Sequence, residues 1–259
     1  MLGWPRGAPP TRLPNAMELG GRVGLVTGAG RRVGRAIATA LGERGMHVAV
    51  HYNGSADGAR ETRSDIERSG GKATLFQADL SRPDAPTVLV NEVAAALGGI
   101  DVLINSAAIM DRTPLDSVTP AQWDAMFAIN SRAPFFASLA AHRHMAARGG
   151  AIVNIADLAA LETWPAYVPH GLSKGVVVDM TRALARQLAP SVRVNAIAPG
   201  VIMLPEGWQA EAGERLRLTT PLKRLGSVND VVGAVIYLLQ ADYVTGETIV
   251  VDGDRHVRR

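Results

Sequence analysis

Short apolar runs alternate with longer segments of helical periodicity along this chain. Near-continuous apolar runs are typical of strands that are covered on both faces, and apolar residues recurring every three or four positions are typical of amphipathic helices. The runs predict strands at 23–26, 46–52, 72–77, 100–104, 151–155, 192–197 and 248–251. The periodic segments predict helices at about 35–41, 56–69, 85–97, 120–147, 167–188 and 227–239.

This regular alternation predicts an α/β protein with a Rossmann-type, doubly wound fold. Right-handed crossovers would place helices on both faces of a seven-stranded, mostly parallel sheet. Because no linker or internal repeat interrupts the pattern, residues 20–259 are expected to be one domain. Residues 207–218 are expected to be a mobile lid.

The first nineteen residues differ in composition from the rest. Residues 1–19 are rich in Pro, Gly and Arg and lack the continuous apolar stretch of a secretory signal. We expect a disordered leader there, and Met17 is a candidate alternative start.

Composition narrows the range of functions. The 259 residues include no cysteine, which excludes disulfides, thiolate metal sites and thiol nucleophiles. The net charge is only +3 and the basic residues are scattered, so no nucleic-acid partner is indicated. No apolar run is long enough to span a membrane, and His142 and His144 lie on different helix faces, so no metal site is expected. We expect a cytoplasmic protein with a small-molecule substrate.

A glycine-rich turn follows the first predicted strand and leads at once into a helix. Its sequence, TGAGRRVG, covers residues 27–34. A helix N-terminus presents unpaired N–H groups and the positive end of its dipole, and glycines let the backbone come close to an anion. The turn therefore suits a phosphate, although an ordinary strand-to-helix turn is the alternative.

The other strand ends favour the phosphate interpretation. In a doubly wound sheet, ligands bind beyond the carboxyl ends of the strands. Several polar or glycine-containing loops would meet the glycine turn at that edge, namely 52–55, residue 79, 105–108, residue 157 and 199–200. Their convergence predicts a dinucleotide site.

The residues around the second strand end indicate which dinucleotide is bound. Proteins that choose NAD usually carry a carboxylate there to bond the ribose 2′-hydroxyl, but residues 51–55 read HYNGS. Arg31 and Arg32 lie in the glycine turn, and a guanidinium favours a 2′-phosphate. The sequence therefore predicts NADPH. The alternative is that both arginines are solvated surface charges.

Several motifs together resemble the short-chain dehydrogenase/reductase family. Residues 27–34 are similar to its TGxxxGxG loop, with Arg32 where the middle glycine is usual. Residues 105–108 (NSAA) resemble its NNAG segment, and residues 251–254 (VDGD) resemble its C-terminal VDGG. The resemblance extends from about Leu19 to the end of the chain.

A narrower resemblance is to pteridine reductases and dihydromonapterin-reductase-like members. These proteins also carry an arginine at the Arg32 position and an aspartate, here Asp157, in place of the usual catalytic serine. Residues 51–56 are similar to their HYxxSA segment and residues 78–81 to their ADLS. The resemblance implies hydride transfer from NADPH to a pterin-like or carbonyl substrate, and a homotetramer.

The resemblance and the strand ends together assign the site residues. The candidate cofactor contacts are Gly28, Arg31, Arg32, Val33, Gly34, Tyr52, Asn53, Ser55, Asp79, Leu80, Asn105, Ser106, Ala107, Lys174, Pro199 and Gly200. Candidate walls of the substrate pocket are Met110, Tyr167, Met203 and Trp208, although packing roles are an alternative for these side chains.

The catalytic spacing of the family is present, but one residue differs. Lys174 follows His170 by four residues, and His170 follows Asp157 by thirteen, where the family has its tyrosine and its serine or aspartate. Residues four apart share a helix face, so His170 and Lys174 can face one cleft. In the family the tyrosine is the proton donor. The lysine lowers its pKa and holds the nicotinamide ribose.

Histidine is a plausible general acid because its reference pKa lies near neutrality. It is shorter than tyrosine, however, and small misplacements of a catalytic group are costly. Tyr167 lies one turn before His170 and is a candidate substitute donor. Asp157 has an alternative role as a helix cap. Asn130, whose family role is to support a water chain to the lysine, is alternatively a buried polar residue that bonds backbone.

Three hypotheses follow from the histidine. The chain is an active NADPH-dependent reductase that uses Asp157 and His170, or an impaired family member that binds cofactor or a partner, or an enzyme of changed chemistry or substrate.

Overall fold

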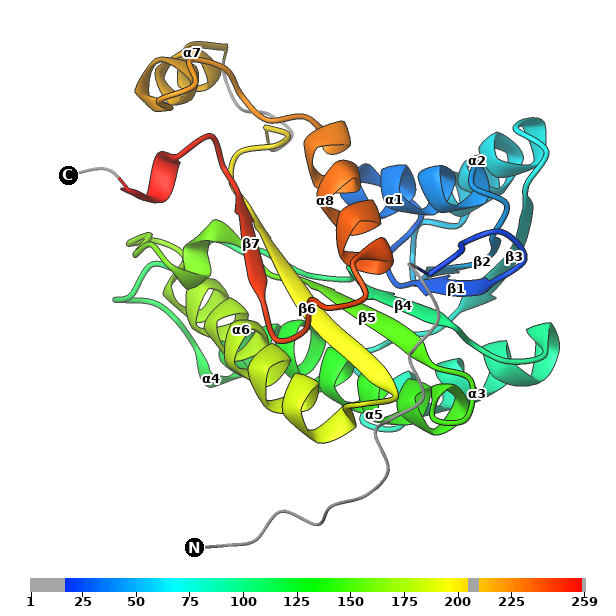
Figure 1. Ribbon diagram of the computed structural model, residues 1–259. Coiled ribbons are helices and arrows are strands. Elements are labelled where there is room, and N and C mark those ends of the chain that lie inside the picture. The colour runs from blue at the N-terminus through cyan, green and yellow to red at the C-terminus, as the bar shows by residue number, and fades with distance from the viewer. Residues whose placement is uncertain (1–16, 205–209, 258–259) are drawn as a thin grey trace, which may run out of the picture.

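Seven parallel strands form one sheet in the computed structural model, which describes residues 17–204 and 210–257 (Figure 1). The strand order is β3-β2-β1-β4-β5-β6-β7. The chain therefore changes direction across the sheet between β1 and β4, which is where doubly wound proteins bind ligands. The strands are β1 (Val23–Val26), β2 (His47–Tyr52), β3 (Lys72–Gln77), β4 (Val102–Asn105), β5 (Gly150–Ile155), β6 (Val192–Pro199) and β7 (Thr248–Val251).

Helices cover both faces of the sheet, as Figure 1 shows. One face is packed by α1 (Arg32–Gly42), α2 (Ala56–Arg68) and α8 (Val228–Gln240). The other face is packed by α3 (Ala85–Leu97), α5 (Ala133–Met145) and α6 (Val168–Leu188). The prediction of a Rossmann-type fold is thus confirmed, and the sheet is wholly rather than mostly parallel.

The two layers of helices explain the apolar runs of the sequence. Strands β1, β4 and β5 lie in the middle of the sheet and are buried along their whole length. The edge strands β3 and β7 have no fully buried residue. Apolar burial on both faces is the main stabilising contribution to such a sheet.

The long helix predicted at 120–147 is interrupted. Helix α4 (Pro120–Phe127) passes into a π-helical turn (Ala128–Arg132), after which α5 begins. Pro134 has no N–H to donate to the carbonyl four residues earlier, which belongs to Asn130. The wider turn accommodates that missing bond, and π-turns of this kind are frequent at functional sites.

The segment expected to be a lid is partly helical. Helix α7 (Ala210–Thr219) takes up 210–218, and an Arg217–Glu214 ion pair one turn apart supports it. Figure 1 shows α7 standing away from the sheet. The remaining part of the expected lid, 207–209, lies outside the described residues and includes Trp208.

The expected leader is described only from Met17 onward. Leu19 is buried, and Met17 packs against the same core as α1 and α8, so these two residues contribute to the packed core. Within the described ranges, no helix combines the length and the apolar character needed to cross a bilayer.

Candidate active site

The glycine loop lies at the carboxyl end of β1, against the segment that follows β4. Gly28 has a φ of +67°, and a Cβ there would lie 2.9 Å from the Cα of Ala107. A Cβ on Gly34 would lie 2.3 Å from the carbonyl oxygen of Gly28. Both contacts require glycine, so the loop forms a tight turn that packs closely against the segment after β4 and against the start of α1.

Thr27 fixes that arrangement and was not among the predicted site residues. Its hydroxyl donates to the carbonyl of Ile104 at 3.3 Å and accepts the N–H groups of Ser106 at 2.9 Å and Ala107 at 3.0 Å. It therefore binds the glycine loop to the end of β4. A buried threonine at the end of an apolar strand was the signal available in the sequence.

Asn105 faces away from the glycine loop. Its side-chain amide donates to Asn154 on β5 at 2.8 Å and to Ser138 on α5 at 3.1 Å. The predicted cofactor contact through this side chain is thus replaced by a structural tie between β4, β5 and α5. The family pattern alone did not indicate which way the amide points.

The loop after β2 packs against the other side of the glycine loop. A Cβ on Gly30 would lie 2.5 Å from the Ser55 hydroxyl, so Ser55 lies directly beside the turn. Tyr52 packs on the core beneath, and the Asn53 carbonyl accepts from Gln77 at 3.2 Å. Arg31 is exposed next to Gly30. Ser55 therefore lies beside Gly30 of the glycine turn, and the exposed Arg31 is the next residue in sequence after Gly30.

Arg32 points to a different part of the site. It has a φ of +51°, in the left-handed region that favours glycine, at the position where the family usually has one. Its guanidinium donates to the carbonyl of Met203 at 3.1 Å, in the segment after β6. In this structure the Arg32 side chain is therefore turned toward the segment after β6, and not toward the loop after β2.

The turn expected to contact the adenine follows β3. Asp79 is exposed, and hydrogen bonds from Ser81 lower its pKa, so it is a carboxylate at neutral pH. Leu80 is buried against the core of the opposite face. At the far end of the site, Gly200 donates its N–H to Val251 at 2.9 Å, directly after Pro199 ends β6.

His170 and Asp157 come together as the spacing predicted. The His170 ring is only 2% exposed, and its Nε2 lies 3.7 Å from Oδ2 of Asp157. Its Nδ1 lies 3.1 Å from the carbonyl oxygen of Ile109. The Asn130 side-chain nitrogen lies farther from Nδ1, at 3.4 Å. Because the nearer partner is a carbonyl, which only accepts, Nδ1 carries a proton and Nε2 is the atom left for chemistry. Among the described residues, Nε2 has no hydrogen-bond partner.

Asp157 caps a short turn and also faces His170. Its Oδ1 accepts the N–H of Ala159 at 2.8 Å and so caps the short 3₁₀ turn Leu158–Ala160. Its second oxygen remains directed at His170. The cap fixes the carboxylate, which positions the charge beside the ring.

Lys174 is buried one helical turn after His170. Its ammonium donates to the carbonyl of Ile155 at 2.7 Å, at the end of β5. Burial lowers the pKa of Lys174 to about 8, and the nearby Asp157 carboxylate opposes that change. A buried amine whose pKa lies near neutrality is typical of functional sites.

Asn130 and Ser173 hold His170 in place. The Asn130 side chain accepts the N–H of Ile109 and donates to its carbonyl, both at 2.9 Å. It also donates to the hydroxyl of Ser173 at 3.0 Å, and that hydroxyl donates to the His170 carbonyl at 2.7 Å. Asn130 thus bonds backbone, and through Ile109 it orients His170. Ser173 was not predicted.

The side chains predicted to line the substrate pocket lie farther apart than those around His170. Met110 and Met203 are exposed, and Tyr167 stacks edge-on against Trp164 with ring centres 6.3 Å apart. Trp208 lies outside the described residues. Within the part of the chain that the structure describes, no three His, Asp or Glu side chains are grouped as metal ligands.

Comparisons with known proteins indicate which family the chain belongs to. A family model described as enoyl-(acyl carrier protein) reductase matches residues 28–254. Versicolorin reductase stcU of Emericella nidulans is 34% identical and is matched over 91% of this chain and 96% of its own length. 3beta-hydroxysteroid dehydrogenase 1 of Eggerthella lenta is also 34% identical, over 91% of this chain and 94% of its own.

Two solved structures are similar throughout. Angucycline C-6 ketoreductase LanV, with bound NADP, has a TM-score of 0.86 and 32% identity, and the match covers 93% of this chain and 98% of that one. FolM alternative dihydrofolate reductase 1 from Brucella canis, complexed with NADP, has a TM-score of 0.88 and 32% identity, with 93% and 96% covered. The chain belongs to the short-chain dehydrogenase/reductase family of oxidoreductases.

Proposed function

We propose that this family member is an NADPH-dependent reductase that uses His170 as its proton donor. The observation that carries the proposal is the placement of Asp157, His170 and Lys174, with Nε2 of the histidine 3.7 Å from the Asp157 carboxylate and without a partner in the described structure. The substrate class is a pterin-like or carbonyl compound. When bound, NADPH supplies the hydride.

The residues around the glycine loop fit NADPH. A side chain at Gly28 or Gly34 would collide with the backbone of Ala107 or of Gly28, so only glycine keeps the tight turn that leads into the first turn of α1, where a phosphate would bind. Ser55 and Arg31 would hold the 2′-phosphate, and no carboxylate follows β2 to favour NAD. The two NADP-bound relatives support the same cofactor. Asp79 would contact the adenine, and Lys174 the nicotinamide ribose.

The proton would leave from Nε2 of His170. Since Nδ1 keeps its proton in the bond to Ile109, only the doubly protonated ring has a proton to give from Nε2. The Asp157 carboxylate lies 3.7 Å from Nε2 and so faces the atom that would give up the proton. After donation the ring is neutral and remains held by Ile109, so the geometry needs no rearrangement.

Pterin-like substrates are favoured by two further observations. Asp157 replaces the usual serine, and Arg32 reaches the Met203 carbonyl, so a planar donor lies at the substrate side of the cofactor. A guanidinium pairs well with the ring nitrogens and carbonyl of a pterin. The similarity to a FolM structure supports this substrate class.

The test is NADPH oxidation against dihydropterins, quinones and simple ketones. The wild type is compared with His170→Tyr, and His170→Gln serves as a control that cannot act as an acid. The proposal expects activity in the wild type, a fall of about 100-fold or more in His170→Gln, and a lower rate at high pH as the ring loses its second proton. A wild type no faster than His170→Gln on every substrate would contradict it.

A second candidate function is a cofactor-binding protein with impaired chemistry. It is favoured by the burial of Nε2. A tyrosine is longer than a histidine, so its oxygen would lie farther from the helix backbone, and a substrate has to come closer to the helix to reach Nε2. A large gain in reductase activity in His170→Tyr would support this candidate. A loss would support the active histidine.

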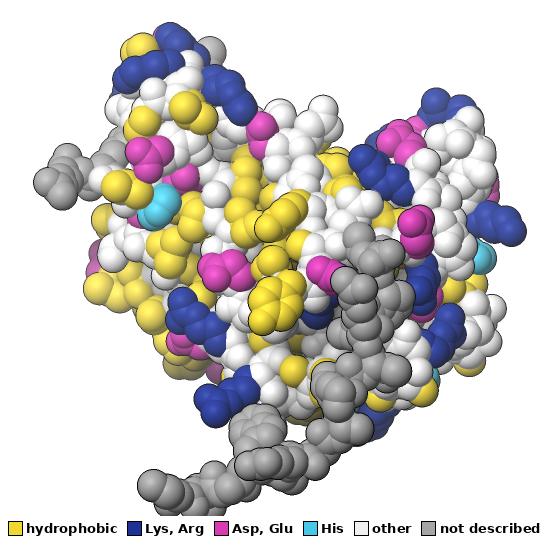
Figure 2. Space-filling view, viewed as in Figure 1, with side chains coloured by type: hydrophobic (Ala, Val, Ile, Leu, Met, Phe, Trp, Pro, Cys, Tyr) yellow, Lys and Arg dark blue, Asp and Glu magenta, His cyan; other side chains and the backbone are white. Residues whose placement is uncertain are grey.

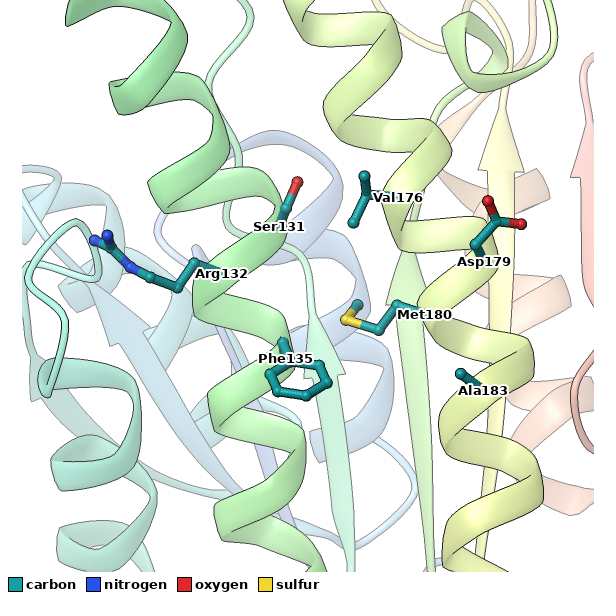
Figure 3. Close-up of a pocket in the computed structure, with 7 residues that line it drawn as sticks. All are labelled: Ser131, Arg132, Phe135, Val176, Asp179, Met180 and Ala183. Carbon is teal, nitrogen blue, oxygen red and sulfur yellow. The ribbon is translucent and has the colours of Figure 1, made fainter.

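We also propose that the chain assembles into a homotetramer. A dihedral tetramer needs two different self-complementary surfaces. Phe135 of α5 and Val176 and Met180 of α6 line a largely apolar hollow of about 480 Å³. Figure 3 shows these three side chains between the two helices. Figure 2 shows hydrophobic side chains along β7 and the adjoining α8, where Tyr237 is 54% exposed. Light scattering would show tetramers in the wild type and dimers in Val176→Arg, whereas a monomeric wild type would contradict the proposal.

A further inference from the structure

His51 is a buried titratable side chain that the proposed chemistry does not use. It lies near the end of β2 and is 2% exposed. The Gly28 N–H donates to its Nδ1 at 3.1 Å, and its Nε2 lies 3.1 Å from the carbonyl oxygen of Ala78. Its own carbonyl accepts the N–H of Ala29 at 2.8 Å.

These partners fix the protonation state of the ring. A backbone N–H only donates, so Nδ1 is unprotonated, and a carbonyl only accepts, so Nε2 carries the proton. The ring is therefore neutral, with both nitrogens engaged. Burial supports this state, because it lowers the pKa of His51 to about 4.

The ring joins two loops that are distant in sequence. Gly28 begins the glycine turn, which would hold the phosphates. Ala78 immediately precedes Asp79 and Leu80, the turn expected to hold the adenine, and its N–H is bonded to the Tyr52 carbonyl at 3.1 Å. One side chain thus sets the spacing between the supports for the two ends of an ADP group.

The same contacts decide which N–H groups remain for an anion. Those of Gly28 and Ala29 are both taken by His51, through its ring and its carbonyl. The first N–H groups of a helix have no partner within the helix, and α1 begins at Arg32. The phosphates would therefore meet the first turn of α1, while His51 fixes the direction of the turn before it.

We infer that His51 is a positioning residue for the ADP half of NADPH, acting through its simultaneous bonds to Gly28 and Ala78. This inference rests on the proposed use of NADPH. The proton-donor group is held separately, by bonds among Asn130, Ile109 and Ser173. Loss of the ring should therefore weaken NADPH binding much more than it slows turnover at saturating cofactor.

The variants separate the bridge from simple packing. His51→Leu removes both bonds, whereas His51→Asn keeps one acceptor and one donor on a shorter side chain. His47→Leu is the matched control, because His47 lies on the same strand and bonds the Thr74 hydroxyl at 3.0 Å, at the opposite end of the sheet. His51→Ser, with a hydroxyl too short to span both loops, replaces His51→Leu if the latter does not fold.

Two readouts are measured on each purified full-length variant. The first is the NADPH dissociation constant, from fluorescence titration, together with kcat. The second is amide hydrogen exchange of residues 27–34 without cofactor. We expect His51→Leu to bind NADPH at least about tenfold more weakly, as two lost buried hydrogen bonds imply, with kcat within about twofold. His51→Asn should recover most of the affinity and His47→Leu should match the wild type.

The outcomes distinguish this inference from the proposed function. Equal NADPH affinity in His51→Leu and the wild type would overturn the positioning role, as would equal losses in His51→Leu and His47→Leu. A wild type that does not bind NADPH would refute both the proposed cofactor and this role for His51. In that case, faster amide hydrogen exchange of residues 27–34 in His51→Leu, but not in His47→Leu, would still assign the ring to holding the glycine loop.

Discussion

Acidification should destabilise this protein through His51 in a calculable way. The pKa of His51 falls from its ordinary 6.5 to about 4 on folding because the ring is buried. The unfolded chain therefore binds a proton at this residue below pH 6.5, whereas the folded protein binds it only when the pH falls to about 4. The contribution of His51 to the free energy of unfolding is complete above pH 6.5 and is lost as the pH falls toward 4.

The size of the effect follows from that difference in pKa. Each unit is about 1.4 kcal/mol, so about 3 kcal/mol is lost between pH 7 and pH 4, of which about 2 kcal/mol is lost by pH 5. This is a large fraction of the 5–15 kcal/mol that is typical of whole domains. It should be visible in urea unfolding at a series of pH values.

His51→Asn provides the comparison that isolates this residue. The pKa of His47 is also lowered, by burial and by Lys72, and hydrogen bonds from Ser81 lower the pKa of Asp79. Both residues add to the acid sensitivity of the wild type and of the variant, so they cancel in the comparison. The difference between the unfolding free energies of the wild type and His51→Asn should be about 2 kcal/mol smaller at pH 5 than at pH 7. Parallel pH dependences in the two proteins would show that the ring is not neutral and buried as argued.

Two substitutions test other parts of the site. Arg32→Gly should raise the free energy of unfolding by about 0.5–1 kcal/mol, because it relieves a left-handed φ of +51° and loses only an exposed hydrogen bond to Met203. An unchanged or lower denaturation midpoint would contradict this prediction. Asn130→Ala should cost about 2–3 kcal/mol, because it leaves the part-buried N–H and carbonyl of Ile109 without this partner. It should also lower kcat, because Ile109 orients His170, and an unchanged kcat would contradict that role.

The sequence was most informative where one local rule decides the structure. The strands were predictable because both faces are covered, which makes each run apolar without alternation. The distance of thirteen residues between Asp157 and His170 also sufficed, because both follow β5 and the structure brings them within 3.7 Å. These features depend on composition and spacing alone.

The direction of individual side chains depended on tertiary partners. Asn105 stands opposite Asn154 in the register of β4 and β5, and this pairing turns its amide inward. Arg31 and Arg32 are adjacent in sequence, yet the left-handed φ of Arg32 sends its side chain toward Met203. The π-turn around Asn130 shows in the sequence only as Pro134, and a proline is equally compatible with the first turn of an ordinary α-helix.

The glycine loop and the proton donor differ in how far they depart from the family. Around the loop, the one departure is Arg32, and it keeps the backbone conformation that glycine would have. At the proton-donor position, a neutral polar hydroxyl is replaced by a ring whose Nδ1 is already bonded to Ile109 and whose Nε2 faces a carboxylate. Among the described residues Nε2 has no hydrogen-bond partner and faces a half-buried carboxylate, an arrangement that is costly if the ring only fills space. His170→Gln keeps polarity and size but cannot be charged, so it separates a proton-transfer role from a ring that merely occupies the tyrosine position.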